Sequence, residues 1–461
     1  NAKANEVWMI ESLSQRAGFP TDLFLTLRRV KDGAEIGTAD DDGTSPIGTR
    51  FVISSDDPVL RTPQLAEGEY LVGVRHLYTA IKPNARLLYR LRIRPVQPDF
   101  SLLVLHNAPG QPNAAEQPGS LLVRRGGNQH LDVYAVRRDG FNGEIAVKVD
   151  GLPAGVTCSP VTLGPGLPGQ PGQIHTPLVF SAANDAPIAT GTLTITGTAT
   201  IDGKPVVREA RAGVATWGFA ANQPFLGQAR LARSIPIAVR EGAPYRVVAM
   251  PAQETLSRGM PLKVKLELTR YGEFKDQVVG ITAVSLPPNA RNATVVIPAG
   301  KNDGELSINL PPNVAVGTYT IAFRGNAPAV PFTKDPDGKN KNNVQVADIS
   351  TPVILTVTDP IALSVDPSSA AVKQGDNVEA TVAITRQGKF TGPVQLQFVQ
   401  LPANVKSTTV TVAPESNEGK LVITAAANAA KGTFSNIVLR AGVQVAGQGI
   451  NIDKPFTLKI E

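Results

Sequence analysis

The stretch Gly375–Phe390, GDNVEATVAITRQGKF, contains the pattern that decides the fold of this chain. Its residues 380–384 (ATVAI) alternate with period two, which is typical of a β-strand with one buried face. Arg386, Gly388 and Phe390 follow this strand, where the glycine allows a positive φ in a hairpin turn and the phenylalanine returns inward to pack. The stretch therefore predicts a strand that runs into a tight turn.

The same arrangement occurs three times along the chain. In each copy a Gly lies 15 residues before a Phe, and a Leu-Pro pair lies 11 or 12 residues after that Phe. An Ala-x-Gly-Thr segment comes next, with its Gly 30 or 38 residues after the Pro. An Arg and a Gly stand just before each Phe, and a Pro-led alternating strand closes each copy. Because several anchors keep their order and spacing, we interpret them as three copies of one module. The anchors are Gly126, Arg138, Gly140, Phe141 and Leu152-Pro153; Gly259, Arg270, Gly272, Phe274 and Leu286-Pro287; and Gly375, Arg386, Gly388, Phe390 and Leu401-Pro402.

These repeats predict Ig-like domains at 96–242, 243–358 and 359–461. Strands recur every 8–12 residues with turn signals between them, which is typical of β-sandwiches. The first copy is longer because it contains two Pro/Gly-rich insertions, Asn107–Gly119 and Gly164–Gln173. The linkers are short, which favours a stiff or semi-stiff rod.

Residues 1–95 lack these anchors and predict a different small sandwich. Alternating or apolar stretches at 7–11, 23–27, 69–74 and 88–93 predict its strands, and the acidic loop Ala39–Gly43 (ADDDG) lies between them. The fold class expected for the whole chain is therefore all-β, with tandem β-sandwiches.

Composition and charge exclude several classes of protein. The 461 residues include 42 Gly, 38 Pro and one Cys, so the chain is rich in turns and cannot form an internal disulfide. The net charge is +6 and aromatic residues make up 5%, with basic residues scattered, which argues against a nucleic-acid partner. No apolar run reaches the ~18 residues of a membrane span. The first residues contain neither a signal peptide nor an initiator Met, and we interpret the chain as a mature or cut form of a longer precursor.

The first 95 residues resemble the C-terminal two-thirds of a bacterial pre-peptidase C-terminal (PPC) domain, a jelly-roll-like sandwich. The resemblance rests on Asp22–Leu27 (DLFLTL), Gly33, Asp40–Asp42, Glu67–Val74 (EGEYLVGV) and Tyr89–Ile93 (YRLRI). Its usual leading strands are missing, so the domain is expected to be partial. Residues 96–461 resemble the Ig-like modules of large envelope proteins of planctomycete-type bacteria, through Arg137–Gly143, Gly151–Val156 and Ser350–Val357. Together the two resemblances imply a secreted, cell-surface or periplasmic bacterial protein.

The best candidate metal ligands are Asp40, Asp41 and Asp42. Calcium takes six to eight oxygen ligands, which clustered carboxylates beside a glycine turn can supply in part, and PPC-type domains can bind calcium through such loops. The alternative is a solvated turn. No other cofactor is expected. The four His residues are far apart, no GxSxG is present, and Cys158 is read as a structural thiol, so no enzyme activity is expected from these residues.

We therefore expect a non-catalytic scaffold segment of a larger secreted or cell-surface bacterial protein. It would act as a spacer and interaction rod, with other envelope or extracellular proteins, or further copies of itself, as partners. One alternative is a calcium-dependent adhesin that binds glycan or protein. Another is the accessory C-terminal region of a secreted hydrolase whose catalytic domain lies elsewhere.

Overall fold

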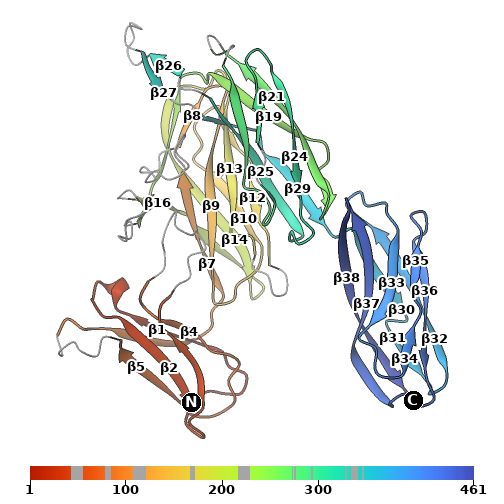
Figure 1. The fold of residues 1–461 in the computed structure, drawn as a ribbon. Helices are drawn as coiled ribbons and strands as arrows, with labels where there is room; N and C mark the ends of the chain where they lie inside the picture. The colour runs from red at the N-terminus through yellow and green to blue at the C-terminus, as the bar shows by residue number, and fades with distance from the viewer. Residues whose placement is uncertain are drawn as a thin grey trace. The chain divides into compact units, whose positions relative to one another are not determined.

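The protein is all-β and folds as tandem β-sandwiches (Figure 1). The computed structural model describes every residue except 43–54, 78–84, 107–120, 167–171, 216–228, 272–273, 275–276, 292–293, 328–329, 334–340 and 345–346. The chain divides into two compact units. The first comprises 1–125 and 129–241, and the second comprises 126–128 and 242–461. The four domain boundaries given above stay predictions.

The N-terminal module consists of two three-stranded antiparallel sheets, in the orders β4-β1-β6 and β3-β2-β5. Among the described residues of this module, six buried apolar side chains form its core, including those of Ile10, Leu25 and Leu60. Its elements are β1 (Trp8–Leu13), the 3-10 helix η1 (Gln15–Ala17), β2 (Leu23–Arg29), β3 (Glu35–Ala39), β4 (Val59–Arg61), β5 (Tyr70–His76) and β6 (Arg90–Pro95).

The third Ig-like module shows the repeated topology most simply. One sheet has the order β30-β32-β36-β34, and the other has the order β31-β38-β37-β33-β35. The early strand β31 runs parallel to the last strand β38, whereas the other pairs are antiparallel. The strands, blue in Figure 1, are β30 (Ile361–Asp366), β31 (Ser369–Val372), β32 (Asn377–Arg386), β33 (Val394–Val399), β34 (Val405–Ser407), β35 (Val410–Val412), β36 (Glu418–Ala425), β37 (Gly432–Val445) and β38 (Gln448–Ile460).

The second Ig-like module repeats this topology, with β20 running parallel to β29. The two-stranded sheet β26-β27 lies in sequence between β25 and β28, whereas the corresponding strands of the third module are joined by a tight turn. The strands are β19 (Tyr245–Pro251), β20 (Thr255–Ser257), β21 (Pro261–Arg270), β22 (Val279–Val284), β23 (Thr294–Ile297), β24 (Asp303–Asn309), β25 (Gly317–Asn326), β26 (Val330–Thr333), β27 (Lys341–Val344), β28 (Ala347–Ile349) and β29 (Val353–Thr358).

The first Ig-like module has the same parallel pair in β8 and β18, and adds the hairpin β16-β17 to one sheet. The predicted insertion Asn107–Gly119 lies outside the described residues, and Gly164–Gln173 is described only in part. The strands are β7 (Asp99–His106), β8 (Leu121–Arg124), β9 (Asn128–Arg138), β10 (Ile145–Asp150), β11 (Val156–Cys158), β12 (Val161–Leu163), β13 (His175–Ala182), β14 (Ala189–Ile201), β15 (Lys204–Glu209), β16 (Arg211–Ala215), β17 (Ala229–Ala232) and β18 (Ile235–Arg240).

Each Ig-like module buries its own hydrophobic core. Counted over the described residues, the three cores contain 26, 24 and 26 buried apolar residues, and the anchors Phe141, Phe274 and Phe390 each belong to one of them. Such cores provide the apolar burial that must offset the loss of chain entropy on folding. Among the residues that the structure describes, no helix is long and apolar enough to cross a membrane.

Candidate functional site

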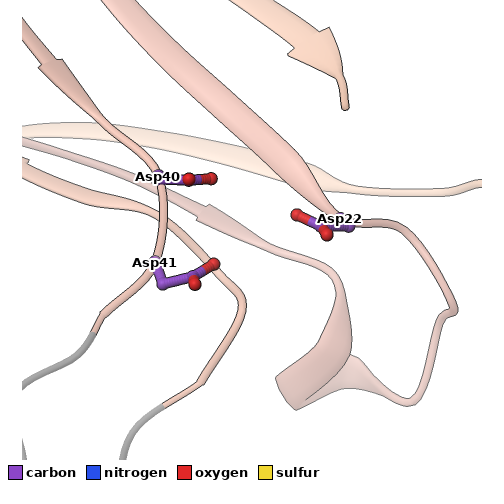
Figure 2. A group of neighbouring side chains, drawn as sticks. All are labelled: Asp22, Asp40 and Asp41. Carbon is purple, nitrogen blue, oxygen red and sulfur yellow. The ribbon is translucent and has the colours of Figure 1, made fainter. Parts of the chain in front are cut away.

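An acidic group in the N-terminal module is the candidate metal site. The hairpin β2-β3 pairs Leu25 with Ala39, so the residue before β2 and the residues after β3 meet at one end of the hairpin. Figure 2 shows that Asp22 faces Asp40 and Asp41 across this end. One carboxylate oxygen from each of the three lies within 4.8 Å of the others. That spacing allows a single cation to touch all three.

The electrostatics of the group fit a hard cation. Oδ1 of Asp22 is buried, and it accepts no hydrogen bond from the residues that the structure describes. Burial, together with the charges of Asp40 and Asp56, raises the pKa of Asp22 above its ordinary value. Desolvation and the charges of Asp40 and Asp56 also raise the pKa of Asp41. A divalent ion would relieve this repulsion and occupy the unused oxygen.

The structure brings a further residue to the predicted site, whose ligands stay a prediction. Asp42 was expected to be a ligand with Asp40 and Asp41, but it does not belong to this three-residue group, and its backbone forms an antiparallel bridge with Ser55. Asp22 lies beside Asp40 and Asp41 instead. Sequence reasoning missed Asp22 because it lies far from the acidic loop in sequence, although the register of a β2-β3 hairpin would have indicated it.

The neighbouring Asp57 has a structural role. This fully buried carboxylate accepts hydrogen bonds from the backbone N–H groups of Ser14, Gln15 and Arg16 at 2.7–2.9 Å, and from the Arg16 side chain at 2.9 Å. These bonds outweigh the effect of its burial and hold its pKa below the ordinary value. Asp57 therefore holds the turn at η1, where backbone N–H groups would otherwise lack partners.

The arginines of the repeated turn bind loops of their own modules. Arg386 donates to the backbone oxygens of Ser416 and Ala413 at 2.6 and 2.9 Å, and to that of Gly392 at 3.3 Å. Arg270 likewise donates to the carbonyls of Gln277, Pro298 and Lys301. A guanidinium carries five donors in a fixed plane, which suits it to gather several carbonyl oxygens.

In the first Ig-like module this role falls to Arg137 and not to the anchor Arg138. Arg137 donates to the carbonyl oxygens of Gly143, Gly164 and Gln173, and its guanidinium lies 5.4 Å from the ring centroid of Phe141. Burial lowers its pKa to about 10. Arg137, Arg270 and Arg386 each precede their Phe by four residues, so the true spacing is uniform. We call the segments Arg137–Phe141, Arg270–Phe274 and Arg386–Phe390 the clamp turns.

The single thiol does not behave as a nucleophile. Cys158 is half-buried at the end of β11, and burial raises its pKa to about 12. The thiolate is therefore scarce at neutral pH, and the thiolate is the reactive form.

No protein-family model matches the chain, and no curated protein matches it. Among solved structures, the native conformation of Escherichia coli alpha-2-macroglobulin matches all of this chain and 38% of its own, at 9% identity and a TM-score of 0.20. A Salmonella alpha-2-macroglobulin mutant matches with 11% identity, the same coverages and a TM-score of 0.21. The ICAM-5 D1-D4 ectodomain fragment matches 78% of this chain and 77% of its own, at 13% identity and a TM-score of 0.18. The chain thus spans under two-fifths of these macroglobulins, and its fold class rests on its own strand pairings.

Proposed function

We propose that this chain is a non-catalytic scaffold segment of a larger secreted, cell-surface or periplasmic bacterial protein. It acts as a spacer that carries tension and offers its surfaces to other envelope or extracellular proteins, or to further copies of itself. The separate cores of the Ig-like modules support this proposal, because each module can stay folded under tension through its own buried apolar residues. The proposed extracytoplasmic location rests on the PPC resemblance predicted from the sequence, for which no family model gives a match.

The observation that carries the proposal is the parallel pairing of early and last strands. In the third module, Ser369–Val372 pairs in parallel with Thr457–Ile460, and β20-β29 and β8-β18 repeat this in the other two. When the two ends of such a module are pulled apart, the paired strands slide past each other. All of their hydrogen bonds are then loaded together and not broken one after another.

Single-molecule stretching tests this spacer function. We expect each Ig-like module to unfold in a separate event, and the stretch from Ile361 to Ile460 to reach a length of about 33–36 nm when fully extended, at ~3.3–3.6 Å per residue. The variant Ala370→Pro removes an N–H on the side of β31 that faces β38 and should lower the force of one event only. A single event for the whole chain, or smooth extension without peaks, would contradict the proposal.

A calcium-dependent adhesin is the second candidate, and the acidic group favours it. The buried Oδ1 of Asp22, which accepts no hydrogen bond from the described part of the chain, and the repulsion between Asp22 and Asp41 suit a bound cation. We propose that Asp22, Asp40 and Asp41 hold calcium, with the remaining ligands supplied by water or backbone oxygens. The ion would order the end of the β2-β3 hairpin and the surface around it.

Calcium should stabilise the N-terminal module. At 1 mM Ca²⁺ and an affinity near 0.1 mM, which is ordinary for extracellular modules, the gain is about 1.4 kcal/mol. Asp41→Asn should abolish the shift in the melting temperature, whereas Glu67→Gln, at an exposed carboxylate of the same module, should leave it intact. If calcium moves the melting temperature equally in both variants, Asp41 is not a ligand.

A further inference from the structure

Besides the hydrogen bonds within their own modules, the first and third clamp turns contact the module that precedes them in sequence. In the first and third clamp turns, the backbone N–H of the Phe donates to the carbonyl three residues earlier at 2.9 Å, from Phe141 to Arg138 and from Phe390 to Gln387. The third and fourth residues of both turns have positive φ, at 54° and 84° in one and 52° and 66° in the other. Both turns therefore present their third residue, Asp139 or Gly388, in the same way.

Gly388 is bonded to the module that precedes its own. The backbone N–H of Ser257, at the end of β20, donates to the carbonyl oxygen of Gly388 at 2.9 Å. A Cβ at Gly388 would lie 2.1 Å from the Ser257 nitrogen, so only glycine permits this approach. Both residues belong to the second unit.

Side chains around this bond close the same junction. Met260 packs against the cores of both the second and the third Ig-like modules. A Cβ on Gly259 would lie 3.2 Å from Cβ of Val445. Arg258 pairs with Asp359 at 2.6 Å and also donates to the carbonyl of Pro312 at 2.9 Å. The short connection between the two modules is therefore packed on one side.

Asp139 makes the equivalent contact inside the first unit. Its carboxylate accepts a hydrogen bond from the backbone N–H of Gln97 at 2.9 Å and pairs with Arg94, on β6 of the N-terminal module. The Asp139 side chain is only 4% exposed, so this pair is largely removed from water. In the first turn the acceptor is the Asp139 carboxylate, and its donor from the preceding module is the Arg94 side chain. In the third turn the acceptor is the Gly388 carbonyl, and its donor is the backbone N–H of Ser257.

We propose that the clamp turn of the first and of the third Ig-like module is the docking surface for the module immediately before it. Its first residue, the arginine, holds the turn to its own module, and its third residue accepts a hydrogen bond from the preceding one. The motif thus encodes a joint of defined geometry within a scaffold. This goes beyond the proposed spacer function, which requires only that the modules be folded and linked.

Disulfide trapping tests the joint at Gly388. In a Cys158→Ser background, the pair Gly259→Cys and Val445→Cys places two Cβ atoms within disulfide reach. With oxidised glutathione we expect near-complete cross-linking, read by mass spectrometry of tryptic peptides. The matched pair Gly300→Cys and Val445→Cys should remain uncrosslinked, because Gly300 is exposed and a Cβ there meets nothing within 4 Å.

A second variant separates docking from folding. Adding Gly388→Ala should slow cross-linking at least tenfold, because its Cβ would collide with Ser257. Gly375→Ala introduces similar strain, at a φ of 85°, but its Cβ meets only Ala427 of its own module, so the cross-linking rate should not change. Slow cross-linking of the parent pair, or equal rates in both alanine variants, would overturn the proposal.

Discussion

Replacing Arg386 with methionine will lower the unfolding free energy of the third Ig-like module by about 3 kcal/mol. The guanidinium satisfies the carbonyl oxygens of Gly392, Ser416 and Ala413 at the same time. Methionine keeps much of the apolar stem but donates no hydrogen bond, so partly buried acceptors lose their partner. A hydrogen bond to a charged group contributes about 1.5–3 kcal/mol to the unfolding free energy. Because this site is partly exposed, we expect the three bonds of Arg386 together to contribute about as much as one strong bond of this kind, about 3 kcal/mol.

Hydrogen exchange of third-module peptides in the full chain measures this loss directly. Arg440→Met is the matched control, because Arg440 lies in the same module and pairs with Asp453 at 2.8 Å on the surface. Exposed ion pairs of this kind contribute less than about 1 kcal/mol. If the two variants lose equal protection from hydrogen exchange, Arg386 stabilises the module no more than an exposed arginine does.

The second large effect concerns Asp348, a buried carboxylate in the second unit. Its two oxygens accept hydrogen bonds from the backbone N–H groups of Asn128 at 2.7 Å and Val247 at 2.8 Å. The Tyr245 hydroxyl accepts from the Asp348 N–H at 3.2 Å and donates to the Gly325 carbonyl at 2.7 Å. Arg246 is the nearby charge that favours ionisation. This network ties β28 to β19.

The unfolding free energy of the second unit should fall as the pH rises from about 4 to 8. Burial raises the pKa of Asp348 to about 8, although the N–H donors and Arg246 oppose the shift. An aspartate in the unfolded chain loses its proton near pH ~4, so between these values the folded state binds the extra proton. The contribution is complete below pH ~4 and is lost as the pH rises through about 8, with a slope of at most about 1.4 kcal/mol per pH unit.

Asp348→Asn removes this titration. We expect a flat profile, with a loss of about 1–3 kcal/mol at pH 5, because the amide NH₂ would face one of the two N–H donors and leave it unpaired. Pulse proteolysis in urea between pH 5 and 8.5, with fragments of the second unit identified by mass spectrometry, gives the profile. Asp303→Asn, at an exposed carboxylate of the same unit, should retain the wild-type slope. If the unfolding free energy of Asp348→Asn still falls as the pH rises, another titratable group causes the pH dependence.

Much of the fold could be predicted from local patterns. The alternating stretch 380–384 lies within β32, with its alternate apolar residues buried as expected. The Phe anchors pack in the cores of their modules, as the turn pattern predicts, because the residue that follows a hairpin turn returns to the buried face. Such features depend on neighbours in sequence, and period-two patterning reports them directly.

Predictions that depended on distant neighbours were less accurate. The closing Pro was expected at the start of a strand, but Pro455 lies inside β38, beside a register shift in β37. It is tolerated there because β31 pairs with β38 only from Thr457 onward, so no β31 acceptor requires an N–H from residue 455. The local sequence around Pro455 does not contain this information.

The sequence by itself determined an all-β chain, a threefold repeat and the position of its turns, because strand alternation and turn chemistry act over a few residues. The tertiary structure was needed to show that Arg137 and not Arg138 is the clamp, that Asp22 lies beside Asp40 and Asp41, and that Asp348 is buried. In each case the role of a charged side chain depends on which backbone groups from distant strands surround it. Those neighbours are set by sheet register and module packing, and no spacing along the chain records them.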